Sequence, residues 1–178
     1  PPCPSLNMSP GKPLNKTAPS NLYSNSTVAL DFNTGRLAWY YQELPGDDWD
    51  ADHNQEPIIA RTRVNPDPKH VKWISSTLPR GEERELVVTV GEGGGMFVLD
   101  RNDGQFLWAR PFPYDDPNLN MNAIDVRTGK TQLNATKVFK KDGDRIVGCY
   151  HNTRAIMQTS YNPQNNSLYV PFHDQCLT

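Results

Sequence analysis

Residues 49–52, Trp-Asp-Ala-Asp, are the segment of this chain best suited to chemistry. The carboxylates of Asp50 and Asp52 lie two residues apart, so both can point the same way from an extended segment. Such a pair can bind a hard cation through its oxygens. A carboxylate beside a metal ion stays ionised and can act as a base. The alternative interpretation is a solvated acidic loop, in which Asp47 and Asp48 simply add charge.

The cysteines and histidines give weaker indications of a chemical site. The three cysteines, Cys3, Cys149 and Cys176, form no Cys-x-x-Cys pair, so neither a zinc knuckle nor a thioredoxin-like site is indicated. Cys149 and Cys176 flank a strand-rich segment and could close a disulfide, which would leave Cys3 over. The four histidines have no metal-ligand spacing, although His53 lies close enough to Asp50 to line the same site.

Composition narrows the function classes. The 178 residues include 18 Lys and Arg against 20 Asp and Glu, a net charge of −2, which argues against a nucleic-acid binder with a basic surface. With 12 glycines and 16 prolines the chain is rich in turns. No apolar run approaches the roughly 18 residues that a membrane-spanning helix needs. We therefore expect neither a nucleic-acid partner nor a membrane span.

Strands must position the acidic motif. Short runs of β-branched and aromatic residues, bounded by turn residues, predict an all-β fold. The clearest predicted strands are residues 26–30, 36–42, 85–91, 95–100, 105–108, 145–150 and 167–172. Residues 44–85 are rich in proline and poor in strand pattern, so they are predicted as a long loop, where function usually lies on a repeat scaffold.

One hairpin pattern recurs at residues 28–39, 98–108, 122–130 and 160–169. In each copy a strand ends at Asp or Asn, whose side chain can cap the turn. Gly, or Asn in the last copy, takes the left-handed position that closes it. Trp39 and Trp108 follow in two copies and can pack between neighbouring sheets.

The repeat spacing predicts a propeller. Asp31, Asp100 and Asp125 are on average about 47 residues apart, close to one propeller blade. The chain therefore predicts roughly three to four four-stranded antiparallel blades. It opens at Pro1 and not at Met, which favours part of a larger ring.

The hairpin repeat, residues 21–30 and the run Pro-Gly-Asp-Asp-Trp-Asp-Ala-Asp at 45–52 resemble the quinoprotein alcohol dehydrogenases, enzymes similar to methanol dehydrogenase that use pyrroloquinoline quinone (PQQ). Residues 96–101, 160–163 and 168–171 follow in the family's order. The resemblance implies that residues 1–178 are a middle fragment of one eight-bladed β-propeller domain, with a long active-site loop at about 44–85.

The same resemblance implies residue roles. Asp50 would be the catalytic base, which takes the proton of the alcohol hydroxyl as hydride passes to PQQ. Asp50 and Asp52 would bind the metal, and an aspartate at position 52 marks members that prefer a lanthanide to calcium. Asn7 stands near the place of a further metal-binding asparagine, and Trp49 belongs to the cofactor-contacting motif.

Two positions depart from the family. Glu92 stands where the family usually has a lysine or arginine that contacts the quinone oxygens, and the glycines around it predict a flexible loop whose register could shift. Ala155 replaces a polar residue that contacts the cofactor. Cys149 and Cys176 match a disulfide of the family, which implies an oxidising compartment, periplasmic or secreted.

The expected function is PQQ-dependent oxidation of an alcohol to an aldehyde. A calcium or lanthanide ion would act as Lewis acid, and electrons would leave to a cytochrome c. A non-catalytic propeller scaffold that has lost the quinone site is one alternative, because of Glu92 and Ala155. A PQQ-dependent sugar dehydrogenase is the other. In each case we expect the chain on its own to be inactive.

Overall fold

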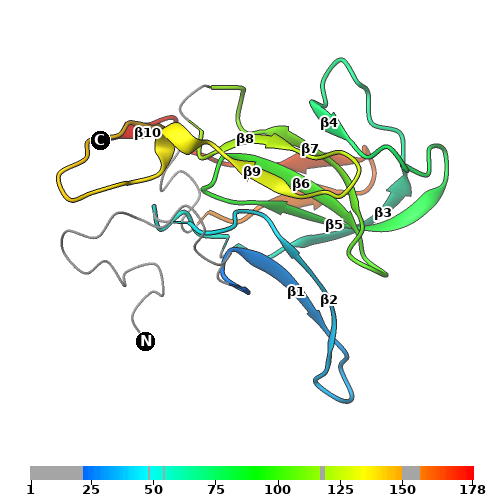
Figure 1. Cartoon of the computed structure of the whole chain (residues 1–178). Coiled ribbons are helices and arrows are strands. Elements are labelled where there is room, and N and C mark those ends of the chain that lie inside the picture. The colour runs from blue at the N-terminus through cyan, green and yellow to red at the C-terminus, as the bar shows by residue number, and fades with distance from the viewer. Residues whose placement is uncertain (1–21, 48, 54, 117–118, 150–156) are drawn as a thin grey trace.

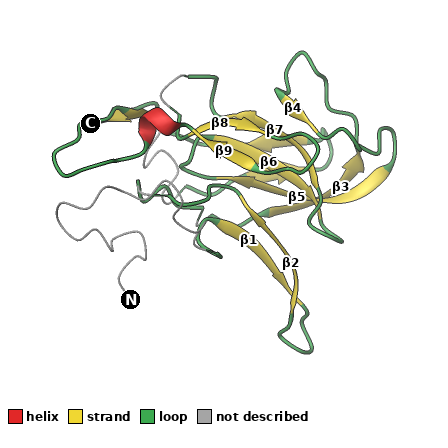
Figure 2. Ribbon diagram, in the orientation of Figure 1, coloured by secondary structure: helices red, strands yellow, loops and turns green. Residues whose placement is uncertain are grey.

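The structure, a computed structural model, describes residues 22–47, 49–53, 55–116, 119–149 and 157–178. Strands make up almost all of the regular structure in this part of the chain (Figure 2). The elements are β1 (Ser26–Leu30), β2 (Leu37–Gln42), β3 (Ile58–Arg63), β4 (Trp73–Ile74), β5 (Glu83–Val90), β6 (Gly95–Asp100), β7 (Phe106–Pro111), β8 (Met121–Ile124), β9 (Thr131–Leu133), the 3-10 helix η2 (Ala135–Lys137), β10 (Gly148–Cys149), β11 (Ser160–Asn162), β12 (Ser167–Tyr169) and β13 (Cys176–Leu177). The predicted all-β class is confirmed.

The largest sheet has five strands in the order β3-β5-β6-β7-β4, and all of its pairs are antiparallel. Its central strand, β6, is apolar and buried along most of its length. Val98 on β6 lies opposite Val88 on β5 and Trp108 on β7. Because both faces of this strand are buried, its residues form a nearly continuous apolar run, and the strand predicted at residues 95–100 is confirmed.

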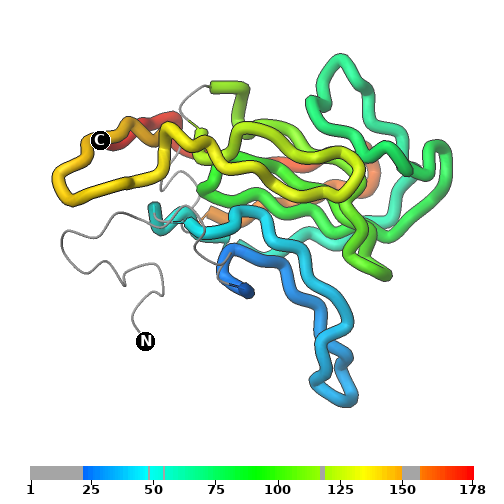
Figure 3. Tube along the Cα trace, viewed as in Figure 1, coloured from blue at the N-terminus to red at the C-terminus, as the bar shows by residue number. Residues whose placement is uncertain are grey.

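Four smaller sheets complete the described fold. Three of them, β1–β2, β8–β9 and β11–β12, are antiparallel hairpins, and the fourth pairs β10 with β13. The β1–β2 hairpin extends away from the five-stranded sheet, with its turn at the far end (Figures 1 and 3). The largest sheet therefore has one strand more than the four-stranded blade expected from the repeat, because the two-residue strand β4 pairs with β7, and the other described sheets have two strands each.

The repeated turns form as predicted. The carboxylate of Asp31 accepts hydrogen bonds from the backbone N–H of Thr34 at 2.8 Å and from its hydroxyl at 2.6 Å. Asp100, Asp125 and Asn162 each accept a backbone N–H two residues further on, at 2.9 Å. The closing residues Gly35, Gly104, Gly129 and Asn166 have φ of 68°, 72°, 75° and 52°. Side-chain capping and a left-handed closing residue thus define all four hairpins.

Trp39 joins two of these hairpins. Its indole N–H donates to the carbonyl of Arg101 at 2.9 Å, in the turn between β6 and β7. A Cβ atom on Gly104 in that turn would lie 2.5 Å from the indole ring. The absence of a side chain at Gly104 therefore lets the β1–β2 hairpin pack on the five-stranded sheet.

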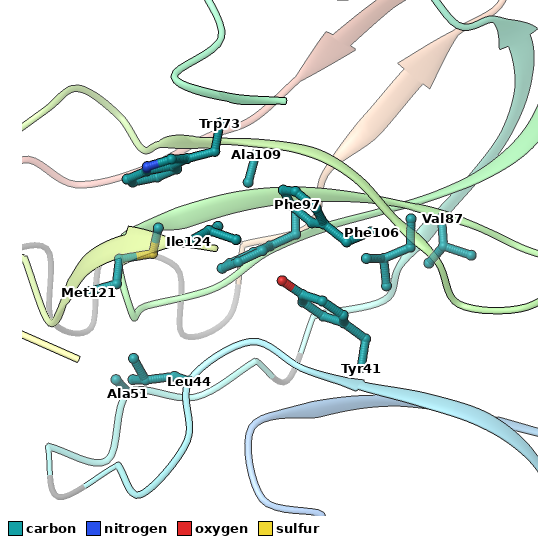
Figure 4. Close-up of a cluster of buried hydrophobic side chains, with 11 residues drawn as sticks. Tyr41, Leu44, Ala51, Trp73, Val87, Phe97, Phe106, Ala109, Met121 and Ile124 are labelled. Carbon is teal, nitrogen blue, oxygen red and sulfur yellow. The ribbon is translucent and has the colours of Figure 1, made fainter. Parts of the chain in front are cut away.

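The main core gathers side chains from several sheets. Tyr41 of β2 lies beside Phe97 of β6 and Phe106 of β7, with ring centroids 5.8 and 6.1 Å away (Figure 4). The Tyr41 hydroxyl donates to the carbonyl of Gly129 at 2.6 Å. Leu44 and Ala51 enter the same cluster from the loop after β2. The loop with the acidic motif is therefore anchored in the core.

Residues 44–85, predicted as one long loop, are a loop only in part. They contain β3 and β4, and β5 begins at Glu83. In β3, exposed Ile59 and Arg61 alternate with the buried Ala60, the pattern of a strand with one buried and one solvated face. No helix in the described part of the chain has the length and apolar character to cross a bilayer.

Candidate active site

Exposed and buried residues alternate along the acidic motif. Asp50 and Asp52 are both exposed, whereas Ala51 between them is fully buried in the main core. Figure 4 shows Ala51 next to Leu44, beneath the aromatic side chains. The buried methyl group fixes the loop, and the two carboxylates lie on its solvent side. The structure therefore keeps the two predicted acidic residues together.

The backbone of the motif is unusual and well bonded. Asp50 has φ of 59°, a left-handed conformation that is uncommon for any residue other than glycine. The N–H of Asp52 donates to the carbonyl of Asp50 at 3.1 Å, and the carbonyl of Asp52 accepts the N–H of Glu92 at 2.9 Å. The motif is thus attached to the turn that joins β5 and β6.

Trp49 packs against the C-terminal part of the fold. Its indole N–H donates to the carbonyl of Lys137 at 2.6 Å, and its ring lies 4.8 Å from that of Phe139. A Cβ atom on Gly148 would come within 2.9 Å of the same ring. The ammonium of Lys137 in turn donates to the carbonyl of Val147 at 2.7 Å. Trp49 therefore attaches the motif to residues 137–148.

The predicted disulfide is present. Cys149 and Cys176 are bonded, with their Cα atoms 3.9 Å apart, and they pair β10 with β13. Because Gly148 precedes Cys149 and contacts Trp49, the crosslink lies close to the acidic motif. The two cysteines are 27 residues apart in the sequence, and a disulfide that closes a loop of this length stabilises a fold by about 3 kcal/mol.

Asp47 is a functional candidate that the sequence analysis treated only as added charge. Its carboxylate accepts the N–H of Trp49 at 2.9 Å and the N–H of Ala51 at 2.7 Å. The available signal was an aspartate placed two residues before the motif, the spacing at which aspartate side chains accept backbone N–H groups. Its oxygens are thus committed to the loop itself.

Glu43 is a second residue that the sequence analysis missed. It is 0 % exposed, and it accepts the N–H of Thr27 at 3.0 Å and the hydroxyls of Thr27 and Thr89 at 2.5 and 3.3 Å. Burial raises the pKa of Glu43 to about 7, and the hydrogen bonds from Thr27 oppose this rise. The signal was its spacing of two from Tyr41, which places both side chains on one face of an extended segment.

Glu92 lies in a packed turn. Its side chain is buried, as are the glycines on both sides of it. A Cβ atom on Gly91 would lie 2.4 Å from the ring of His53, and Gly94 has φ of 87°. The pairing of Gly95 with Pro111 fixes the register of the following strand. The glycines allow close approach here, in contrast to the flexible loop and shifting register that the sequence predicted.

The described residues offer two exposed carboxylates to a metal ion, and these two alone do not complete a metal site. Asp50 and Asp52 offer exposed carboxylate oxygens, the ligands that calcium prefers, but such an ion takes six to eight oxygens. Among the residues that the structure describes, no group of three or more His, Cys, Asp and Glu side chains could hold a metal. Glu92 places a carboxylate where a cation is expected against the quinone. Asn7 and Ala155 lie outside the described residues.

Comparison with known proteins gives matches to one family of dehydrogenases. The family model for the glucose/ethanol/alcohol dehydrogenase β-propeller domain, designated PQQ, matches residues 13–117, more than half of the chain. The chain is 32% identical over 153 residues to quinohemoprotein alcohol dehydrogenase of Comamonas testosteroni, a match covering 85% of this chain and 19% of that protein. It is 34% identical over 158 residues to 1-butanol dehydrogenase (cytochrome c) of Thauera butanivorans, with coverage of 85% and 19%.

Solved structures agree. The quinohemoprotein alcohol dehydrogenase of Comamonas testosteroni superposes with a TM-score of 0.65 at 29% identity, covering 88% of this chain and 21% of that one. A europium-containing methanol dehydrogenase superposes with a TM-score of 0.71 at 26% identity, covering 88% and 24%. The chain thus spans about a fifth of the length of the curated relatives it matches.

Proposed function

Because this chain belongs to the PQQ β-propeller family of glucose, ethanol and alcohol dehydrogenases, we propose that it is part of a PQQ-dependent alcohol dehydrogenase. Residues 1–178 belong in this proposal to one propeller domain. The complete protein oxidises an alcohol to an aldehyde and passes the electrons to a cytochrome c. The quinohemoprotein and cytochrome c-linked relatives support this acceptor.

The single observation that carries the proposal is the acidic motif. Asp50 and Asp52 stay exposed on either side of the buried Ala51, and Asp50 does so in a left-handed conformation. Residues held in sparsely populated backbone conformations cluster at functional sites. An ordinary solvated loop needs neither the strained residue nor the buried anchor.

In this proposal the described residues have separate tasks. Asp50 receives the proton of the alcohol hydroxyl on its carboxylate, as a general base. Asp50 and Asp52 hold the oxygen-liganded cation, calcium or a lanthanide. Trp49 and Glu92 border the cofactor, which when bound supplies a two-electron acceptor for the hydride of the alcohol carbon. Asn7 and Ala155 remain proposed contacts with the metal and the cofactor.

The crosslink supports an oxidising compartment. Disulfides persist in oxidising compartments, and Cys149 is bonded to Cys176. We therefore place the protein in the periplasm or outside the cell. The small-molecule alcohol reaches the site there without crossing the inner membrane.

Glu92 favours a second candidate function. A buried carboxylate at a position where the family has a cation cannot offer positive charge to the quinone oxygens. A propeller that has lost the quinone and serves as a scaffold would tolerate this change. A PQQ-dependent sugar dehydrogenase is a further possibility, because the matching family includes glucose dehydrogenases.

The test uses the protein encoded by the complete reading frame that contains this chain. It is purified, supplied with PQQ and either calcium or lanthanum, and assayed for dye reduction with ethanol, butanol or glucose. Alcohol-dependent turnover that Asp50→Ala abolishes would support the dehydrogenase, and a preference for lanthanum would support Asp52 as a ligand. Turnover with glucose alone would favour the sugar dehydrogenase. Failure to take up PQQ with either metal would favour the scaffold.

A further inference from the structure

The carboxylate of Asp47 accepts hydrogen bonds from the residues on both sides of Asp50. One carboxylate oxygen, Oδ1, accepts the backbone N–H of Trp49 at 2.9 Å, and the other, Oδ2, accepts the N–H of Ala51 at 2.7 Å. These two N–H groups belong to the residues that immediately precede and follow Asp50 in the sequence. One side chain therefore fixes the backbone on both sides of the proposed base.

Asp47 is itself held from another element. The side-chain amide of Asn25 donates to Oδ2 of Asp47 at 3.0 Å. The carbonyl of Asn25 accepts the N–H of Glu43 at 2.9 Å, just after β2 ends. The position of Asp47 is therefore set by the start of the β1–β2 hairpin as well as by its own loop.

The conformation of Asp50 needs such support. With φ of 59° it lies in the left-handed region, which a residue with a Cβ atom occupies only when its surroundings hold it there. In this loop Asp47 accepts the N–H groups of both residues that flank Asp50, and Ala51 is anchored in the core. Without Asp47 the peptides around Asp50 could return to an ordinary conformation and turn its carboxylate away.

We propose that Asp47 is a positioning residue, which orients the carboxylate of Asp50 for proton transfer and metal binding. The inference rests on the function proposed for Asp50. Both oxygens of Asp47 are engaged by N–H donors of the protein, so it acts through Asp50 and not on the substrate. Displacing a catalytic group by about 1 Å can cost as much as 100-fold in rate.

The test is Asp47→Asn in the complete, PQQ-loaded protein. The variant has the same shape, but its amide nitrogen must face one of the N–H groups that the carboxylate now accepts. At saturating metal we expect kcat to fall roughly 10- to 100-fold, while KM for the alcohol stays within about threefold. Because a smaller fraction of folded protein would also lower the apparent kcat at unchanged KM, kcat is calculated per PQQ-loaded protein, and a loss that is only structural would then disappear.

A second readout does not depend on turnover. Terbium(III) alone is titrated into the protein without PQQ, and its luminescence is excited through tryptophan, since Trp49 adjoins Asp50. We expect the half-saturating terbium concentration to rise roughly 10- to 100-fold in Asp47→Asn. An unchanged terbium titration together with unchanged kcat would overturn the positioning role.

Matched controls separate this inference from the proposed function. Asp103 accepts the N–H of Gln105 two residues on at 2.9 Å, the same kind of turn bond remote from the motif, so Asp103→Asn should keep kcat within about twofold. Asp50→Asn should be inactive. Inactive Asp50→Asn beside fully active Asp47→Asn would overturn the positioning role alone, whereas active Asp50→Asn would contradict the proposed function and the inference with it.

A gentler variant covers a failure of Asp47→Asn to fold. Asn25→Gly removes only the bond to Oδ2 of Asp47, and glycine tolerates the φ of 44° found at Asn25. We expect the same split between kcat and KM at a smaller size, roughly 3- to 10-fold in kcat. An unchanged kcat in this variant, with terbium affinity also unchanged, would count against the proposal.

Discussion

Glu43 shows how a single side chain can make the stability of this fold depend on pH. It is fully buried between Thr27 and Thr89, whose hydroxyls donate to it. Desolvation raises its pKa from 4.5 to about 7, and the hydrogen bonds from Thr27 only partly counter that rise. The folded protein therefore binds a proton at Glu43 more tightly than the unfolded chain does.

The stability contributed by protonated Glu43 is largest below pH 4.5 and is lost as the pH rises to about 7. Over this window the folded state binds more protons, so stability falls by about 1.4 kcal/mol per pH unit, or about 3 kcal/mol in all. Glu43→Gln keeps acceptor and donor groups for Thr27 but does not titrate. Urea unfolding at pH 4 and pH 8 should show the wild type losing about 3 kcal/mol relative to the variant. Parallel losses would contradict the raised pKa.

The sequence could identify those site residues whose pairing depends on spacing or on the family resemblance. Asp50 and Asp52 could be paired from their separation of two, and Cys149 and Cys176 from the family match. The roles of Asp47 and Glu43 depend on which backbone and side-chain groups surround them, and strand pairing decides this. The left-handed conformation of Asp50 has only a weak residue-type signal, because aspartate adopts it occasionally and glycine, the usual marker, is absent there.

At the scale of the elements, turn chemistry was the best guide. Aspartate or asparagine, followed at a fixed offset by glycine or by the asparagine of the last copy, located all four hairpin turns, because these residues act locally. β3 was missed inside a proline-rich region, and β4 has two residues that are strand only because β7 lies beside them. These two strands form by pairing with segments that are distant in the sequence. Such pairing has no local sequence signature, so the strands could not be predicted.

Gly104 and Gly35 occupy the same position in two of these turns but have different neighbours. Their φ angles are 72° and 68°, yet a Cβ atom would meet the ring of Trp39 at 2.5 Å on Gly104 and nothing within 4 Å on Gly35. We expect Gly35→Ala to cost about 1 kcal/mol for the left-handed backbone. Gly104→Ala should cost about 1 to 3 kcal/mol more, because Trp39 must move.

Denaturant unfolding of both alanine variants measures this difference directly. Trp39 fluorescence should change in Gly104→Ala and stay as in the wild type in Gly35→Ala, since only the former touches the indole. Equal destabilisation of the two variants would mean that Trp39 adapts freely. The contact between the β1–β2 hairpin and the five-stranded sheet would then be weaker than the geometry indicates.

At the scale of the whole molecule, the β1–β2 hairpin presents apolar side chains to solvent. Phe32 at its turn is 98% exposed and Leu30 is 60% exposed. A groove of about 570 Å³ beside them is lined by Val28, Trp39 and Ile59 among others. Exposed apolar patches and open sheet edges favour association with another chain segment. The chain spans about a fifth of its relatives, so we propose that further blades cover this hairpin in a complete propeller.

The 178-residue chain prepared by itself should therefore self-associate. Sedimentation velocity over a tenfold range of concentration should show a weight-average mass that rises with concentration, because apolar side chains of the hairpin are exposed. Leu30→Lys should shift the distribution toward the monomer, since it places charge on the exposed strand. Tyr169→Ser on β12, another exposed site at 53%, is the matched control and should leave the association unchanged. If both variants associate equally, the adhesive surface lies elsewhere; if Leu30→Lys alone is monomeric, the hairpin carries the surface that the rest of a propeller would bury.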